Sequence, residues 1–321
     1  MAVSDQVFTY GPSNVGSLLA TTLSKYAKKM ADNIFSGIPL LAYLGMKNRI
    51  TEDGGATLIR PVMYSKNNTA AFYSADDVLN TTIQDPYTAA QWQWRQCAAS
   101  VAITGRIERQ NSGDSQVIDY VTAQISHAEL SLKDLMDRYL FLTSQTGPNI
   151  TPLPAIVANT GTVGDINGST NSWWQSNITS SAGSFSASGL SNLRNSWNSV
   201  NILNPQGPVD LILSDQNSYQ YYEATLVPAV RITDVEMGDL GFQNLKYKTC
   251  TWTFDPNATS GNIWGINSKA LELVQHARTM FVLSEWVKPA DQDMKVAEVL
   301  WMGELTTNNR RKLFNISGVT A

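Results

Sequence analysis

The chain has 321 residues, of which 43% are apolar and only 16% are charged, and its formal net charge is −4. This acidic balance argues against a nucleic-acid reader, which normally presents a basic face. The charged fraction lies well below the roughly 25% typical of soluble domains, so neutral polar side chains must cover much of the surface. Such a surface suits wide contact with other protein, because Asn and Thr cost less to desolvate than Lys or Glu. A secreted β-rich protein is the alternative that this composition leaves open.

Residues 1–48 are predicted to form an N-terminal arm. Within it, apolar residues at helical spacing predict an amphipathic helix over about 14–32. Asp53-Gly54-Gly55 then predicts a turn, and Ala56–Tyr64 a strand. Because Pro61 has no N–H to donate to a sheet ladder, this strand should lie at a sheet edge or carry a bulge.

A second extended run is expected from Thr88 to Ile103, with Trp92 and Trp94 on one of its faces. The polar connection Ser65–Tyr87 that precedes it exceeds the roughly 12–15 residues usual for a structureless loop in a compact domain. A long two-stranded arm fits this pattern. An isolated ribbon is only marginally stable in water, so such an arm should gain its order by lying on a neighbouring molecule.

One long helix is the clearest element of the sequence. Apolar residues recur every three or four positions from Val117 to Leu142, which predicts an amphipathic helix of about 28 residues. Asp114 is the expected N-cap, and Gly147-Pro148 should end the helix. A helix this long with a single apolar stripe should back onto a sheet or span a subunit.

The rest of the chain predicts a mixture of helices and strands. Residues 148–187 are rich in Gly, Ser, Thr and Asn and are expected to be an irregular surface segment around Trp173-Trp174. Helices are expected from Leu190 to Val200 and from Asp215 to Tyr222, the second with Asp215 as its N-cap. Strands are expected over Val209–Leu213, Leu245–Phe254, Asn262–Ile266, Leu271–His276, Asp293–Leu305 and Lys312–Val319. Without an internal repeat, this order is typical of an α+β fold.

The sequence offers no catalytic, cofactor-binding or metal-ligating motif, so none is assigned. It contains neither the Gly-x-Ser-x-Gly of serine hydrolases nor a phosphate-binding loop, and His127 and His276 form no helical metal pair. Cys97 and Cys250 are predicted to be buried thiols, and no secretion signal precedes them. A glycosidase-type carboxylate pair stays open among Asp53, Asp76, Asp77, Asp234, Glu236 and Asp239.

Two further features have competing interpretations. The nine tryptophans favour packing in a core or an interface over stacking on carbohydrate, because large aromatic side chains dominate buried protein contacts. The basic run Arg310-Arg311-Lys312 is short, and a solvated turn is a better interpretation than a phosphate-binding site.

The order of these elements resembles the Hong Kong 97-type fold of tailed-phage major capsid proteins. Several short stretches resemble that family in the same order along the chain, and together they span nearly all of it. They are Ala31–Phe35, Asp53–Gly55, Thr88–Trp94, Val101–Gly105, Asp234–Leu245 and Gly303–Asn309.

The resemblance implies a division of the chain. An extended β-hairpin loop over residues 49–105 would follow the N-terminal arm and overlap an adjacent subunit. Residues 106–149 and 268–304 would form a peripheral domain with a spine helix at about 114–143. Residues 150–267 and 305–321 would form an axial domain.

The resemblance also implies a non-enzymatic function. The chain would assemble with itself into hexamers and pentamers of an icosahedral head shell around double-stranded DNA, in the host cytoplasm during assembly and then in the virion. A separate scaffolding protein, a portal and a decoration protein are the other implied partners, and no cofactor or membrane is implied. An encapsulin-like nanocompartment and a carbohydrate-binding or hydrolytic β-rich protein are the alternatives. Inter-subunit contacts are expected at Lys66, Phe72, Tyr73, Asp76, Asp77, Trp92, Trp94, Trp286 and Lys288.

Overall fold

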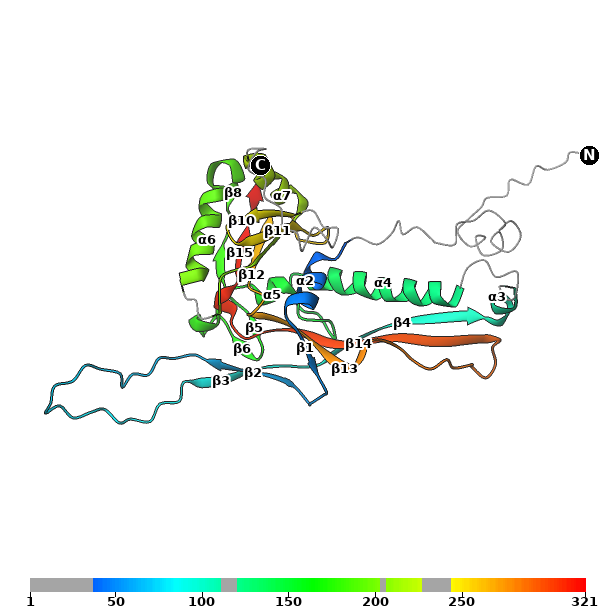
Figure 1. Ribbon diagram of the computed structural model, residues 1–321, viewed down its shortest axis with the longest axis horizontal. Helices are drawn as coiled ribbons and strands as arrows, with labels where there is room; N and C mark the ends of the chain where they lie inside the picture. The colour runs from blue at the N-terminus through cyan, green and yellow to red at the C-terminus, as the bar shows by residue number, and fades with distance from the viewer. Residues whose placement is uncertain (1–36, 111–119, 203–205, 227–243) are drawn as a thin grey trace, which may run out of the picture. The chain divides into compact units, whose positions relative to one another are not determined.

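The computed structural model describes residues 37–110, 120–202, 206–226 and 244–321 (Figure 1). The predicted helix at 14–32, the Asp114 cap and three of the scattered carboxylates, Asp234, Glu236 and Asp239, lie outside these ranges. The described residues belong to two compact units. The first contains 98–110, 120–132 and 281–300, and the second contains 37–97, 133–202, 206–226, 244–280 and 301–321.

A two-stranded ladder forms the predicted β-hairpin. The helix α2 (Pro39–Lys47) leads to β1 (Arg49–Glu52), and the chain then passes Gly54 and Gly55, both at positive φ, to β2 (Leu58–Met63). β2 pairs antiparallel with β3 (Tyr87–Trp92), and the two strands form a sheet of their own.

Pro61 lies inside β2 without disturbing the ladder. The N–H of Tyr64 donates to the carbonyl of Pro86 at 2.9 Å, so hydrogen-bonded pairs repeat at every second residue from that point. Pro61, opposite Ala89, therefore falls at a non-hydrogen-bonded position, where its missing N–H faces away from β3. The prediction that this strand lies at a sheet edge is confirmed, and no bulge is needed.

The predicted run Thr88–Ile103 is divided between two sheets, because Gln93 and Trp94 interrupt it. The second strand, β4 (Arg95–Thr104), belongs to a four-stranded sheet of order β1-β13-β14-β4. β13 (Leu271–Leu283) and β14 (Met294–Thr307) are the longest strands described. Side chains of β4 alternate between more buried and exposed positions, so one face of this strand is covered.

The long helix is α4, described over Tyr120–Leu140, and the short α3 (Gly105–Gln110) precedes it. Its buried stripe steps by four through Ala128, Leu132, Met136 and Leu140. Val121 and Leu142, at the ends of the predicted stripe, are more than a third exposed instead. No helix among the described residues is long and apolar enough to cross a membrane.

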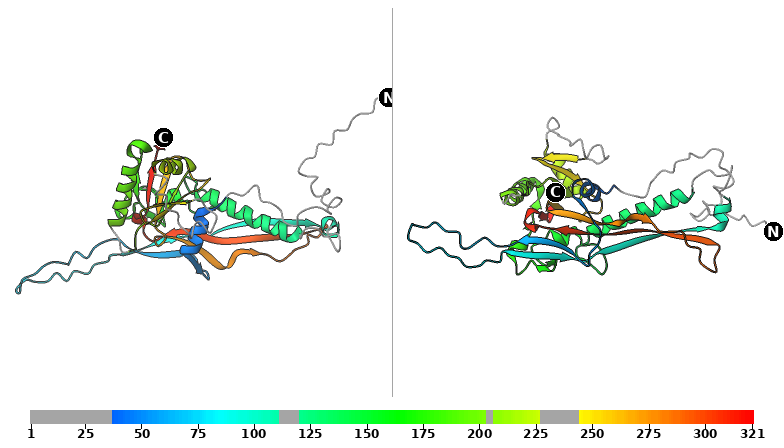
Figure 2. Two further views of the ribbon diagram at one scale, coloured as in Figure 1. Left: turned by 45° about the horizontal axis from the view of Figure 1, so that its top comes forward. Right: turned by 60° about the horizontal axis from the view of Figure 1, so that its bottom comes forward.

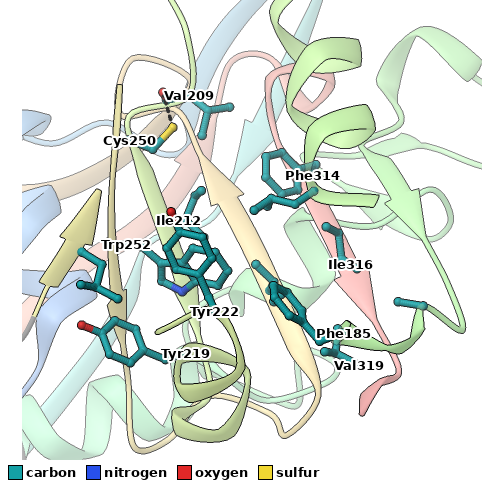
Figure 3. Packing of buried hydrophobic residues seen from close by; sticks show 14 of the residues in the cluster. Phe185, Val209, Ile212, Tyr219, Tyr222, Cys250, Trp252, Phe314, Ile316 and Val319 are labelled. Atoms are coloured by element: carbon teal, nitrogen blue, oxygen red, sulfur yellow. Dashed lines mark hydrogen bonds between the residues drawn. The ribbon is translucent and has the colours of Figure 1, made fainter. Parts of the chain in front are cut away.

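A six-stranded sheet lies within the second unit, in the order β10-β11-β9-β12-β15-β7. Its strands are Asn244–Tyr247, Cys250–Phe254, Leu211–Ser214, Asn262–Ile266, Phe314–Ser317 and Asn177–Thr179, in the same order. The helices α6 (Leu190–Ile202) and α7 (Gln216–Thr225) contribute to its apolar core. In this core Trp252 stacks on Tyr222 with 4.3 Å between ring centroids, and the Cys250 thiol donates to the Val209 carbonyl (Figure 3).

Three sequence predictions for the second unit need correction. The expected strand Leu245–Phe254 is a hairpin, β10 and β11, which turns at Lys248 with a positive φ. Asp215 occupies the N-cap of α7 but makes no capping hydrogen bond through its side chain. The segment 148–187 is ordered, and Trp174 is buried within it with its indole N–H on the Val163 carbonyl. Its short elements are α5 (Leu153–Ile156), β5 (Thr162–Val163), β6 (Ile166–Asn167), η4 (Ser172–Trp174), β7, β8 (Gly183–Ser184) and the π-helical η5 (Phe185–Gly189).

The basic run Arg310-Arg311-Lys312 was expected to be a solvated turn, and this is wrong for two of its residues. It forms the 3₁₀ helix η7, with Arg310 and Lys312 both buried, and the short strand β16 (Val319–Thr320) follows β15. The Arg310 guanidinium donates to the carbonyls of Ile156 and Ala158, each at 2.7 Å. These carbonyls satisfy Nε and Nη2, whereas Nη1 is buried without a hydrogen-bond partner among the described residues. Desolvation lowers the pKa of Arg310 to about 10.

Two buried carboxyl groups meet at the end of α4. Asp137 and Asp255 are at most 1% exposed, and Asn257 donates to both: its amide to Asp137 Oδ2 at 2.7 Å and its backbone N–H to Asp255 Oδ1 at 2.9 Å. Burial raises the pKa of both groups, and the Asp137 charge raises that of Asp255 further. Because two adjacent carboxylates cannot both ionise cheaply in the interior, the pair retains a proton that isolated carboxyls would release.

We expect this pair to destabilise the subunit as the pH rises. The pKa values in the folded state lie above the ordinary 3.8 of an unfolded Asp. The pair's contribution to the unfolding free energy is therefore full below about pH 3.8 and is lost as the pH rises through the raised pKa values. In Asp255→Asn the amide can donate to Asp137 without a shared proton. Chemical denaturation at about pH 5 and about pH 9 should show that the unfolding free energy of both proteins falls with pH. The fall should be smaller for the variant than for the parent by about 1–3 kcal/mol. Exposed Asp53→Asn is the control, and parallel losses in parent and Asp255→Asn would contradict this account.

Leu132→Asp should abolish soluble folded protein, because it places a charge on the buried stripe of α4, where Leu132 is 1% exposed. Soluble yield and circular dichroism measure this. Ser126→Asp, at an exposed position on the same helix, should fold normally. A well-folded Leu132→Asp protein would show that the stripe faces solvent.

Candidate subunit-contact surface

Exposed apolar side chains gather on the β2–β3 hairpin and its loop. Residues 64–86 are here called the contact loop, and the contact loop with β2 and β3 is called the ribbon. Of the seventeen large apolar residues that are exposed in the described part of the chain, nine belong to residues 59–87: Ile59, Met63, Tyr64, Phe72, Tyr73, Val78, Leu79, Ile83 and Tyr87. An apolar surface concentrated in this way is typical of a site that another molecule covers.

The most exposed of these side chains project from the contact loop. Phe72, Val78 and Ile83 have relative exposures of 107%, 97% and 95%, so their own chain covers almost none of their surface. The contact loop runs on from the ladder as a long extension in each view (Figures 1 and 2). Covering these side chains within a partner would therefore gain nearly the full free energy of burial.

At the base of the contact loop, the N–H and the hydroxyl of Tyr64 donate to the carbonyls of Pro86 and Asp85, at 2.9 and 2.8 Å. Beyond this base, its hydrogen bonds are local. The side chain of Asn67 accepts from Thr69, and that of Asn80 accepts from Thr82. Asp77 accepts from the N–H of Ser74 and donates its own N–H to the Ser74 carbonyl. Such turns shape short stretches but do not pair the two arms of the loop with each other. The contact loop thus has local order and an extended backbone on which a second chain can pair.

The ladder of the ribbon, in contrast, is packed on its inward face. Leu58 and Val62 of β2 and Ala90 and Trp92 of β3 are buried on this face, whereas Ile59 and Met63 point outward. The inward position between Leu58 and Val62 is occupied by Arg60.

Gly164 packs against the strand β3 of the ladder. The N–H of Gln91 donates to the Gly164 carbonyl at 3.0 Å. A Cβ at Gly164 would lie within about 3 Å of the Trp92 ring and of Ala90, and the residue has a φ of +60°. Both the close approach and the backbone conformation therefore require glycine. Tyr64 adds an aromatic contact with Trp173, 5.4 Å between centroids.

The contact residues predicted from sequence fall into three groups. Trp92 is buried in its own chain, so we leave it out of the proposed surface. Trp94 is half-buried and donates its indole N–H to the Gly55 carbonyl. Five other predicted contacts are exposed residues of the contact loop: Lys66, Phe72, Tyr73, Asp76 and Asp77. Sequence reasoning missed Val78, Leu79 and Ile83, although apolar residues inside so polar a segment were a usable signal.

Trp286 and Lys288, the last two predicted contacts, belong to the first unit. They lie on the connection between β13 and β14, where Val287 pairs with Val296. Lys288 is exposed and forms a long 3.8 Å ion pair with Asp293. Arg109 binds Asp293 at 2.6 Å, and this hydrogen bond is the main reason that the pKa of Asp293 lies below its ordinary value.

The described residues were also compared with the requirements of a metal site and of a reactive thiol. Among them, no group of three or more His, Cys, Asp or Glu side chains is placed to hold a metal ion. Burial raises the pKa of Cys97 to about 11 and that of Cys250 to about 12, so both are unreactive thiols near neutral pH. Asp53, Asp76 and Asp77 are exposed to solvent.

The fold is similar to that of several solved structures, although the sequence matches no family model. No family model matches the sequence, and no curated protein matches it. Among solved structures, the capsid of cyanophage A-1(L) matches with a TM-score of 0.71 and 16% identity, over 94% of this chain and 98% of that chain. The capsid of an empty GTA particle matches with a TM-score of 0.66 and 9% identity, over 97% and 100%.

A shell of another kind also matches. The SrpI encapsulin of Synechococcus elongatus PCC 7942 has a TM-score of 0.60 and 10% identity, over 99% of this chain and 96% of that chain. All three matches span nearly the whole of both chains at very low identity. They confirm the fold that the sequence resemblance implied: the chain has the Hong Kong 97-type fold of these shell proteins.

Proposed function

We propose that the chain is a major capsid protein of a tailed bacteriophage, which assembles with copies of itself into the icosahedral shell of the head. The contact loop carries this proposal. It presents apolar side chains that its own chain leaves almost fully exposed, on a segment shaped by local turns. A second copy is the partner that the shell-forming fold supplies.

The energetics suit a shell with many weak contacts. Each large apolar side chain of the loop would contribute about 1.5–3 kcal/mol on full burial, before the cost of ordering the loop is subtracted. The ribbon and the surface that it meets are different patches, so the contact is heterologous and closes into rings by rotation. Hexamers and pentamers are such rings, and we propose both for this chain.

The domain division implied by the resemblance remains our proposal. The N-terminal arm would be 1–48, the extended loop 49–105, the peripheral domain 106–149 with 268–304, and the axial domain 150–267 with 305–321. The six-stranded sheet supports the last assignment, because five of its strands fall in 150–267 and its sixth, β15, falls in 305–321.

An encapsulin-like shell is the second candidate function, supported by the SrpI match. The contents of the particle distinguish the two functions, since a phage head encloses double-stranded DNA and a nanocompartment encloses protein. The net charge of −4 is compatible with a shell that encloses DNA without gripping it. We propose a scaffolding protein, a portal and a decoration protein as further partners, with assembly in the host cytoplasm.

A carbohydrate-binding or hydrolytic function has less support. Trp174, Trp252, Trp264 and Trp301 are at most 2% exposed, so they pack in the interior and offer no face to a sugar. This agrees with the sequence-based preference for packing. We therefore propose a structural, non-enzymatic role.

Removing the contact loop should abolish shell formation without unfolding the subunit. In the test variant, Asn-Gly replaces Ser65–Asp85, because a two-residue turn can join the strands while the Tyr64–Pro86 pair is kept. Circular dichroism should match the parent, whereas negative-stain microscopy and sedimentation should show capsomers or monomers only. Shells of normal size from this variant would refute the proposed role of the ribbon.

A full-length variant tests the apolar side chains alone. Phe72→Ser with Ile83→Ser should raise the protein concentration needed for assembly, by about tenfold for each 1.4 kcal/mol by which the substitutions weaken the association free energy. Asn68→Ser with Thr81→Ser, at exposed polar positions of the same loop, should leave that concentration unchanged. Light scattering against concentration measures both. Equal thresholds for all three proteins would show that these side chains stay exposed in the particle.

A further inference from the structure

One charged side chain lies on the inward face of the ribbon. Arg60 stands between the buried Leu58 and Val62 of β2, and its side chain is 14% exposed. Its Nε donates to Glu272 Oε2 at 2.6 Å, and its Nη2 lies 2.9 Å from Glu52 Oε1. A single guanidinium therefore ties the ribbon to two strands of the four-stranded sheet, β13 and β1.

Glu272 is itself held from its other side. Its Oε1 accepts a hydrogen bond of 2.9 Å from the Asn308 amide, and Thr306 lies at 3.5 Å from its Oε2. The side chain of Glu272 is 9% exposed. The acceptor that meets Arg60 thus has a fixed position, and the guanidinium must come to it. Desolvation lowers the pKa of Arg60, but the hydrogen bonds and charges of Glu272 and Glu52 outweigh it and raise the pKa overall.

The ladder is also held on its other strand. Arg60 pairs in register with Ala90, and the neighbouring Gln91 donates its N–H to Gly164. The ion pairs on β2 and the hydrogen bond on β3 are directional contacts at two separate places. The apolar contacts of Leu58, Val62 and Trp92 are not directional, so they would tolerate a range of ribbon angles.

A buried ion pair is a poor source of stability, because the cost of desolvating both charges offsets most of their attraction. Replacement of such a pair by apolar residues is often neutral or stabilising. A pair on an otherwise apolar docking face is therefore better explained by geometry than by stability.

We infer that Arg60 is a positioning residue: through Glu272 and Glu52 it sets the angle at which the ribbon leaves the second unit, and so determines which surface of a neighbouring copy the contact loop reaches. This inference rests on the proposed function, in which the contact loop binds a second copy. The ion pairs of Arg60 with Glu272 and Glu52 are called the clamp. Loss of the clamp should leave a stable subunit whose ribbon points in several directions.

The test uses the full chain with Arg60→Met and Glu272→Met combined. The parent and this variant should have similar melting temperatures and circular dichroism. The parent should form particles of one size, whereas the variant should lose that uniformity and give mixed or open assemblies under the electron microscope. Arg60→Lys keeps the charge but cannot bridge both carboxylates, and it should give an intermediate spread of sizes. Particles of uniform, parental size from the double variant would overturn the inference.

A second measurement reports the ribbon angle without assembly, and it also decides the case if the double variant folds poorly, because Arg60→Lys can replace it. Spin labels are attached at Met63→Cys, at the exposed end of β2, and at Gln220→Cys, on the exposed side of α7. The partly exposed Cys97 is replaced by Ser in parent and variants alike, and Cys250 is fully buried, so the labels attach at the two introduced thiols. In dispersed parent subunits the distance distribution should have one maximum, and loss of the clamp should remove it. A single unchanged maximum in the variants would overturn the inference.

Replacement of the contact loop by Asn-Gly separates the two possible failures. If that protein fails to assemble while the clamp variants form normal particles, the proposed function stands and the positioning role of Arg60 is wrong. If the loop replacement also forms normal particles, the contact loop does not bind the second copy, and the positioning inference fails while the shell-forming function stands. If the parent chain itself forms no particles, the proposed function is wrong.

Discussion

The constraint on which the structure depends is that the contact loop has apolar side chains but no apolar core of its own. Phe72, Val78 and Ile83 stay in water unless another molecule covers them. A segment with only local turns gains little from its own contacts and must offset its ordering entropy by contacts with a partner. The free energy for assembly is thus held in the part of the subunit that contributes least to its folding.

The two ends of the ribbon have different roles: the ladder is fixed to the rest of the chain, and the contact loop is exposed. At the base of the ribbon, Arg60, Gly164 and the buried inward face hold the ladder against the rest of the second unit through directional and close-packed contacts. Beyond Tyr64 the two arms are no longer paired with each other. A subunit built in this way can hold the contact loop at a defined place while the loop adapts its conformation to the surface that it contacts. Weak contacts then become specific because each one is made in a fixed geometry.

Much of this architecture could be predicted from sequence, because it follows from local periodicity. The strand Asn262–Ile266, the helix α6 and the described part of α4 lie where apolar spacing placed them. The errors have a shared physical cause. Arg310 can be buried because carbonyls more than 150 positions away accept hydrogen bonds from its guanidinium. Arg60 forms its ion pair with Glu272, which is 212 positions away. Such pairings arise from tertiary structure. The apolar residues of the loop were visible in the sequence, but their exposure was not.

Hydrogen–deuterium exchange of the contact loop, in dispersed subunits and in assembled particles, tests the central claim most directly. If the loop gains its order from a neighbouring copy, backbone amides of residues 65–85 should exchange within seconds in the subunit and become strongly protected in the particle. Amides of β2 and β3 should be protected in both states. Equal protection of the loop in the two states would contradict the claim that assembly covers it.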